Sequence, residues 1–344
     1  MLGRKVTHKI LGSGIITELS SAYLTVNFGG SEKKFTYPDV FEQYLTSTDP
    51  ELMGQVDRDL AAKRADRARV VLSTIHSSAT PQQSQILPRK KLKKAERFNV
   101  VFKCNYCDGG KRQNHIGFQG VCSDSVLRYN IEEAHHVWCA SKGSPCRRYL
   151  DGEITRDELE SMMHGGHGLD SVCDESHMLR DWMASAGVVQ TGTDKGKPMR
   201  LLKVQSNSLA ILTTREPNAI SDESRFIFAV FLVDESYEGD NRDAGYVTTN
   251  SEWKIELSPI EAHRIRFWNY YANGNAPQKI VFGSGLHRYL SDEQAAQILR
   301  DIVAVKRNPQ EKEFAQRFFE HFCRINAINV NDLPLPNGAL MRKR

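Results

Sequence analysis

The fold is decided by residues 201–239, which read LLKVQSNSLAILTTREPNAISDESRFIFAVFLVDESYEG. Residues 208–214 and 226–234 are dense in β-branched and aromatic side chains, and they predict two buried strands separated by a polar excursion. Two shorter strands are expected at residues 246–249 and 253–257. This order of elements favours a curved mixed sheet. Neither the glycine-rich motif of dinucleotide-binding folds nor the P-loop motif occurs in the sequence.

Two helices are expected after this sheet. Residues 292–306 have helical periodicity, with Ser291 as the N-cap and Gln294 as its capping-box partner. Residues 312–325 carry a second helical pattern. The sequence therefore predicts a C-terminal α+β domain over residues 187–330.

The first 48 residues contain short alternating segments separated by glycine and serine turns, and they predict a small β-barrel of the SH3-like or Tudor-like kind. The residues VTHKILGSGIITELSSAYLTVNFGGSEKKFTYPDVFEQYL resemble the Tudor-like tail of superfamily-one DNA helicases. That tail has the pattern V-x-H-x-x-F-G-x-G-x-V, and Leu11 replaces its usual aromatic. In that family the tail docks on a protein or nucleic-acid partner and carries no catalysis. The resemblance implies a recruitment module.

Residues 49–97 predict a helix followed by a linker rich in Ser, Pro, Gln and Lys. The linker carries a basic run that favours polyanions such as DNA or RNA, namely Lys90, Lys91, Lys93 and Lys94. Residues 331–344 form a second basic segment, the C-terminal tail. The alternative for both segments is an ordinary solvated chain.

Seven cysteines in a chain without an export signal argue against a disulfide framework. Six of them lie in a region that we bound at residues 98–186: Cys104, Cys107, Cys122, Cys139, Cys146 and Cys173. The first two form C-x2-C-x-G with Gly109, the form of a zinc knuckle, in which two thiolates on a tight turn bind one tetrahedral ion. The sequence predicts a metal-stabilised α/β domain with these six cysteines as ligands.

Two metals are compatible with the cysteine spacings. The first is structural zinc, in one or two sites built from the six thiols, either alone or joined by His115, His164, His167 or His177. The second is a 4Fe–4S cluster on Cys122, Cys139, Cys146 and Cys173, because such clusters accept cysteines from separate loops. The segment WCASKGSPCRRYL also resembles cysteine segments of iron–sulfur DNA-processing enzymes. Cysteines without metal, a nucleophilic cysteine, and an open zinc on His164, His167 and Cys173 are the remaining alternatives.

Aromatic and basic residues interleave in the C-terminal domain, at residues 267–271 (FWNYY) and in GSGLHRYLSDEQ. A sheet with an inserted polar loop, this pattern and a terminal helix together resemble the PUA-like group, which includes the EVE and YTH modules. The resemblance implies a pocket for RNA, or for DNA bases flipped out of the duplex. The expected roles are base-edge hydrogen bonds from Ser206, Asn207 and Ser208, stacking by Trp253 and Trp268, and phosphate contacts from Arg215, His287 and Arg288. The alternatives are core packing for the aromatics and a turn at residues 206–208.

The combined layout, with FKCNYCDGG, IGFQGVCSD and PCRRYLDGEI, resembles an uncharacterised bacterial multi-module family. A chain of 344 residues with 40% hydrophobic and 26% charged residues is typical of a globular protein with several domains. No apolar run approaches eighteen residues, so we expect a cytoplasmic protein that makes no membrane contact.

These observations predict a non-catalytic nucleic-acid-binding protein that reads a modified or flipped base, with phage defence as one setting for such a reader. The metal module would be structural, and the N-terminal barrel would recruit a protein partner. Two alternatives come from other classes. One is a metal-dependent nucleic-acid-processing enzyme, and the other is a protein–protein adaptor.

Overall fold

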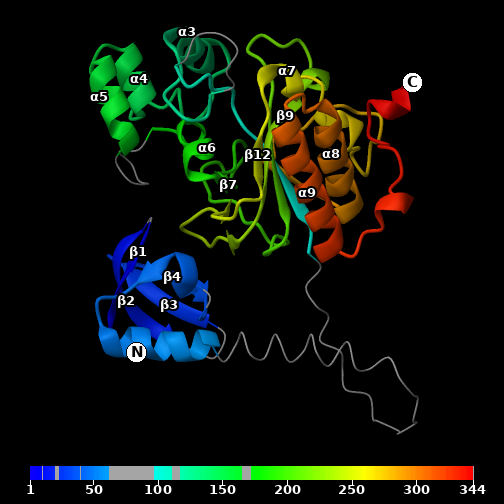
Figure 1. The fold of residues 1–344 in the computed structure, drawn as a ribbon. Helices are drawn as coiled ribbons and strands as arrows, with labels where there is room; N and C mark the ends of the chain where they lie inside the picture. The colour runs from blue at the N-terminus through cyan, green and yellow to red at the C-terminus, as the bar shows by residue number, and fades with distance from the viewer. Residues whose placement is uncertain are drawn as a thin grey trace, which may run out of the picture. The chain divides into compact units, whose positions relative to one another are not determined.

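The computed structural model describes residues 1–9, 11–19, 23–38, 40–61, 97–110, 117–164 and 172–343 (Figure 1). The chain divides into two compact units, Met1–Lys93 and Lys94–Arg344. It is a mixed α+β protein with three sheets, two antiparallel and one mixed. The linker residues Lys90, Lys91, Lys93 and Lys94 lie outside the described residues.

The first unit contains a five-stranded antiparallel sheet. Its strands are, in spatial order, β4 (Ser31–Thr36), β3 (Tyr23–Phe28), β2 (Gly12–Leu19), β1 (Lys5–His8) and β5 (Leu45–Thr46). α1 (Val40–Gln43) precedes β5, and residues 50–61 are helical. Within the described residues β4 and β5 do not pair with each other, so closure into a barrel is not observed.

The residues that carry the helicase-tail resemblance are packing residues in this sheet. The ring of His8 lies 5.2 Å from that of Phe35 and 5.9 Å from that of Tyr44, and burial lowers the pKa of His8 to about 4. Gly14 is needed because a Cβ at that position would lie 2.6 Å from the Phe28 ring. The V-x-H pattern and the second glycine of G-x-G therefore reflect close packing, whereas the first, Gly12, has a left-handed backbone with φ of 74°.

The second unit is built on a five-stranded mixed sheet, the central sheet. Its strands are, in spatial order, β12 (Lys254–Glu256), β9 (Phe226–Leu232), β8 (Leu209–Thr214), β6 (Asn99–Lys103) and β13 (His287–Leu290). β6 and β8 run parallel, and every other neighbouring pair runs antiparallel. All residues of β8 and β9 are buried, as expected for central strands with packing on both faces.

Two helices, α8 (Asp292–Val305) and α9 (Pro309–Ile325), lie side by side along the central sheet (Figure 1). The predicted capping box of α8 is confirmed. The amide of Gln294 donates to Ser291 Oγ at 3.2 Å, and the amide of Ser291 donates to Gln294 Oε1 at 3.0 Å. Asn308 caps α9, which begins at Pro309, three residues before the predicted start.

The cysteine-rich segment follows β6 and consists of short helices. They are α3 (Asp124–Arg128), the π-helical η1 (Tyr129–Glu133), α4 (Pro145–Leu150), α5 (Arg156–Ser161), η2 (Met162–His164), η3 (Asp174–Ser176) and α6 (Met178–Asp181). The Phe118 ring stacks on Phe228 of β9 with a centroid distance of 4.0 Å. Buried residues of this segment and of the central sheet form one continuous core. Regions 98–186 and 187–330 are therefore parts of one compact unit.

A three-stranded antiparallel sheet completes the second unit, with β10 (Glu235–Tyr237), β11 (Tyr246–Thr248) and β7 (Met183–Ser185) in that order. The four predicted strands and two predicted helices of the C-terminal region are confirmed, with small differences at their ends. The partner strands β6 and β13 were not predicted. Among the described residues, no helix is both long and apolar enough to cross a membrane.

Candidate nucleic-acid interface

One edge of the central sheet brings together segments that are far apart in the sequence. β6 and β8 run parallel and end together, with Lys103 opposite Thr213. β9 and β13 run the opposite way and begin at this edge, with His287 of β13 opposite Phe102 of β6. We call it the carboxyl edge, after the carboxyl ends of β6 and β8. Edges of this kind, where loops leave a rigid sheet, are common places for binding sites.

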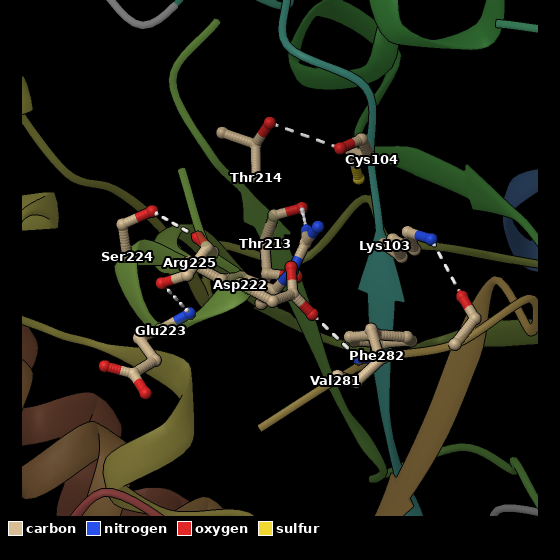
Figure 2. A network of polar contacts seen from close by, with 12 residues as sticks. Lys103, Cys104, Thr213, Thr214, Asp222, Glu223, Ser224, Arg225, Val281 and Phe282 are labelled. Carbon is tan, nitrogen blue, oxygen red and sulfur yellow. Dashed lines mark hydrogen bonds and ion pairs between the residues drawn. The ribbon is translucent and has the colours of Figure 1, made fainter. Parts of the chain in front are cut away.

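Four cationic side chains gather at the carboxyl edge: Lys103, Arg215, Arg225 and Arg288. Three of them surround one aromatic ring, that of Phe282. The distance to the ring centroid is 4.7 Å from the Arg288 guanidinium carbon, 5.3 Å from that of Arg225 and 6.0 Å from Lys103 Nζ. Figure 2 shows Lys103, Arg225 and Phe282 close to the end of β6. Arg215 follows the last residue of β8 directly.

Arg225 is the buried member of this cation cluster, with 2% of its surface exposed. Its Nε donates to Asp222 Oδ1 at 3.1 Å, and Nη1 donates to both the carbonyl and Oγ1 of Thr213 at 3.4 Å. Asp222 Oδ2 also accepts from the amide of Phe282 at 2.7 Å. Figure 2 shows how Asp222 joins the guanidinium to the Phe282 segment. Arg225 is therefore a structural cation with a dedicated partner.

The other three cations have no carboxylate partner among the described residues. Lys103 Nζ donates to the carbonyl of Gly283 at 2.9 Å, and Arg288 donates to two backbone carbonyls. Arg215 makes no hydrogen bond or ion pair with a described residue. Among the described residues, Asp222 is the one carboxylate that forms an ion pair with a member of this cluster. The cluster therefore contains more cations than ion-paired carboxylates, while Glu216 follows Arg215 directly and Glu175 Oε1 accepts from the Asn105 amide.

This excess charge acts on the ionisable groups nearby. Burial lowers the pKa of Lys103, the charge of Arg225 lowers it further, and Asp222 opposes the shift. Burial also lowers the pKa of His136 to about 4, with smaller contributions from Lys103 and Arg215. In both groups burial disfavours the charged form most, and the neighbouring cations add to the effect. A bound anion would relieve this repulsion.

The predicted site residues divide between two opposite edges of the central sheet. Arg215, His287 and Arg288 lie at the carboxyl edge. Ser206, Asn207 and Ser208 precede β8 and therefore lie at its amino edge. A six-residue strand separates the two groups by roughly 20 Å. These residues do not form one pocket.

The amino-edge residues hold the backbone together. Ser206 Oγ donates to the carbonyl of Asp234, and Ser208 Oγ donates to that of Phe98, both at 2.7 Å. The Asn207 carbonyl accepts from Arg97 at 2.9 Å, and Asn207 has a left-handed backbone with φ of 70°. The two serine hydroxyls and the Asn207 backbone already have protein partners, which matches the turn that was the alternative.

The two tryptophans proposed for stacking pack within the protein. Trp268 is 0% exposed, and its ring centroid lies 4.9 Å from that of Phe267 in the core. Trp253 is partly buried and stacks on His321 of α9 at 4.4 Å. Neither arrangement presents a free ring face at the carboxyl edge. The alternative of core packing accounts for both.

Sequence reasoning missed Lys103, Asp222, Arg225 and His136. The sequence did contain a signal for Asp222 and Arg225. Opposite charges at i and i+3, immediately before the buried run FIFAVFL, indicate a local ion pair. Lys103 and His136 gave no such signal, since their proximity depends on pairing between distant strands.

All six clustered cysteines are buried and free of disulfide bonds. A hydrogen bond with Cys107 raises the pKa of Cys122, as do burial and the charges of Cys139 and Cys146. A hydrogen bond with Cys139 likewise raises the pKa of Cys173. Five thiols therefore interact in one region. Cys107 pairs with Cys122, Cys139 pairs with Cys173, and Cys146 acts on Cys122 and Cys173. The sixth, Cys104, lies with its Sγ 3.6 Å from Met178 Sδ.

The thiol donor set suits zinc or an iron–sulfur cluster chemically, because cysteine thiolate is a ligand of both. The observed arrangement does not supply a formed site. Within the described ranges, no group of three or more His, Cys, Asp or Glu side chains is placed to hold a metal ion. His115 and His167 lie outside the described residues. The metal remains a prediction from cysteine chemistry.

A cavity of about 460 Å³ lies between α7 (Pro259–Ala262) and the start of α9. Lys306 Nζ lies 3.1 Å from Glu261 Oε2 and 2.7 Å from Glu311 Oε2. The lining contains three carboxylates against two cations, so this cavity lacks the positive excess of the carboxyl edge.

No protein-family model matches this chain, and neither a curated protein nor a solved structure matches it. Its function must therefore be argued from the site itself.

Proposed function

We propose that this protein binds nucleic acid, with the phosphates at the carboxyl edge of the central sheet. The observation that carries the proposal is the charge balance there, in which Lys103, Arg215 and Arg288 have no carboxylate partner among the described residues. A chain of phosphates provides several negative charges at short spacing, which suits several cations on one rigid edge.

The arrangement favours a polyanion on energetic grounds. Cations held close together in a partly buried place repel one another, and this repulsion lowers the free energy of unfolding. Backbone hydrogen bonds to Gly283, Phe282 and His287 orient the Lys103 and Arg288 heads without neutralising them. Phosphate contacts would provide the missing negative charge. Three such contacts predict a slope of about −2 to −3 for log K against log salt.

Several finer parts of this proposal rest on resemblance. They are a Tudor-like recruitment role for the first unit, a PUA-like identity for the second, and recognition of a modified base. A structural zinc ion on the cysteines, with a 4Fe–4S cluster as the alternative, rests on donor chemistry: five buried thiols interact and none is in a disulfide. When bound, the ion would crosslink short helices that have little regular structure of their own.

The experiment is a binding titration with labelled DNA and RNA oligonucleotides against salt. Arg288→Ala should weaken binding and lower the slope by about 0.7 to 0.9, the share of one phosphate contact. Lys203→Ala is the matched control, because Lys203 is an exposed lysine beside Phe98 at the amino edge. It should leave the slope unchanged. A Lys203 effect as large as that of Arg288 would place the interface elsewhere.

The same titration separates the rival functions. A protein–protein adaptor would show no affinity for either nucleic acid. A nucleic-acid-processing enzyme would bind the labelled strand and shorten or modify it, which denaturing gels and mass spectrometry would reveal.

A further inference from the structure

Trp138 stands on an ordered turn beside the carboxyl edge. The turn follows η1 and is held by backbone hydrogen bonds, from the amide of His136 to the Asn130 carbonyl at 2.9 Å and from the amide of Ala140 to the His136 carbonyl at 2.8 Å. Trp138 is nevertheless 42% exposed. The turn therefore presents part of a large aromatic ring to solvent from a fixed backbone, where the ring loses little additional freedom on binding.

The turn is fastened to the carboxyl edge through Tyr106. Asn130 Nδ2 donates to the Tyr106 carbonyl at 3.1 Å, and Tyr106 lies three residues beyond Lys103. Burial raises the pKa of Tyr106, and the charge of Glu216, the residue after Arg215, raises it further. The turn is thus supported by the segment that leaves β6 just after Lys103.

The electrostatics of the turn agree with the position that the Asn130–Tyr106 hydrogen bond gives it. The charges of Lys103 and Arg215 both act on His136, which precedes Trp138 by two residues. Other apolar side chains are exposed around the edge. Val281, beside the Phe282 ring, is 46% exposed, and Ile220, in the loop before Asp222, is fully exposed. Exposed apolar groups beside unpaired cations are the two components of a surface that binds single strands.

Building on the proposed function, we propose that Trp138 stacks on an unpaired base of the nucleic acid whose phosphates contact Lys103, Arg215 and Arg288. The bases of a continuous duplex are covered on both faces by their neighbours, so an indole reaches a base face only in a single strand or on a base turned out of the helix. The carboxyl edge therefore takes single-stranded nucleic acid in preference to duplex.

The test compares the full chain with its Trp138→Ala and Trp138→Phe variants. The probes are fluorescein-labelled oligo-dT and oligo-rU of about twelve nucleotides and a mixed-sequence duplex of equal length. Trp138→Ala should weaken single-strand binding roughly 5- to 150-fold, the range for one lost stack. Trp138→Phe should recover most of that loss. Leu202→Ala, at an apolar residue 59% exposed near the amino edge, is the control and should bind as wild type.

Two further readouts separate stacking from charge. The salt slope should be the same for Trp138→Ala and wild type, whereas Arg288→Ala lowers it. Tryptophan fluorescence of the wild type should be quenched by the single strand, and Trp138→Phe should lose that quenching while remaining folded by circular dichroism.

The outcomes distinguish this inference from the proposed function. If Arg288→Ala weakens binding and Trp138→Ala does not, or if the duplex binds as tightly as the single strands, the stacking inference is overturned and the phosphate interface stands. If the wild type binds none of the probes at low salt, the proposed function fails, and the stacking inference fails with it.

Discussion

Arg225 and Asp222 form an ion pair with 3.1 Å between Nε and Oδ1, and their side chains are only 2% and 12% exposed. The second carboxylate oxygen of Asp222 accepts from the Phe282 amide at 2.7 Å. One carboxylate therefore holds both the buried guanidinium and the segment whose ring lies among the cations (Figure 2). The carboxyl edge depends on this pair for its shape.

Asp222→Asn should destabilise the second unit, because it leaves the buried Arg225 charge without its counter-charge. Breaking a buried pair in this way costs about 3–5 kcal/mol of unfolding free energy. Urea unfolding followed by fluorescence measures it. Asp222→Asn with Arg225→Met should recover part of the loss, because the unpaired charge is removed. A single variant as stable as wild type would show that the pair does not hold the edge.

The same substitution should not weaken nucleic-acid binding by the protein that stays folded. Asp222→Asn removes the one paired carboxylate, so the edge becomes more positive and its affinity for phosphates should stay equal or rise. Anisotropy titration at a temperature well below the unfolding transition measures this. A loss of affinity in folded protein would mean that Asp222 itself contacts the ligand.

Binding should strengthen as the pH falls below neutral. The pKa of His136 is about 4 in the free protein, so the imidazole is neutral at pH 7. A phosphate beside Lys103 and Arg215 would favour the imidazolium and raise that pKa, so binding takes up a proton and affinity rises as the pH falls from about 7 toward 5.5. His136→Gln should flatten this dependence. An equally steep dependence in that variant would assign the proton to another group.

The pH range of that assay is bounded by stability. A histidine whose pKa falls from 6.5 to about 4 on folding contributes stability that is present above pH 6.5 and lost as the pH falls toward 4. His8 and His287 share this shift with His136. Unfolding free energy should therefore decrease on acidification, and binding is best compared above about pH 5.5.

Glu235→Gln should stabilise the protein at pH 8 and not at pH 4. Burial raises the pKa of Glu235 to about 7, and its Oε2 has no partner among the described residues, whereas Oε1 accepts from the Tyr246 hydroxyl at 2.8 Å. Below pH 4.5 the Glu235 carboxyl is neutral in the folded and the unfolded protein and costs no stability. The free energy of unfolding falls as the pH rises from 4.5 through 7, because the buried carboxyl then has to ionise. Because the side chain is partly exposed, the expected gain at pH 8 is about 1–2 kcal/mol. Thermal unfolding at both pH values tests it, and an equal effect at both would contradict the assigned pKa.

Metal analysis tests the cysteine proposal. Protein purified anaerobically should contain about one zinc ion per chain and be colourless, whereas a brown protein with iron would indicate the cluster. Cys122→Ser should lose the metal, since Cys122 interacts with three other cysteines. Cys104→Ser should retain it, because Cys104 faces Met178. Folded wild-type protein without any metal would leave the thiols as core residues.

Local patterns in the sequence predicted the elements of the fold well. The buried runs of β8 and β9 and the Ser291–Gln294 box were readable because side-chain period and capping chemistry are local properties. The pairing of β6 with β8 could not be predicted, since these strands are more than a hundred residues apart and no local feature specifies which strand lies next to which.

The candidate site was only partly predictable for the same reason. Arg215 and Arg288 were nominated and lie at the carboxyl edge, whereas Ser208 lies at the far end of β8. Alternation shows which residues are buried but does not show which strand ends meet. Composition also cannot distinguish the fully buried Trp268 from the exposed Trp138, because both lie in short segments without a clear period.

Phosphate binding at the carboxyl edge is tested most directly by the salt dependence of nucleic-acid binding by the wild type and by a variant with Lys103→Ala, Arg215→Ala and Arg288→Ala. We expect measurable binding by the wild type at about 50 mM salt, with a log–log slope of about −2 to −3 that falls close to zero in the triple variant. Wild-type protein without affinity at that salt concentration, or a triple variant with an unchanged slope, would contradict phosphate binding there.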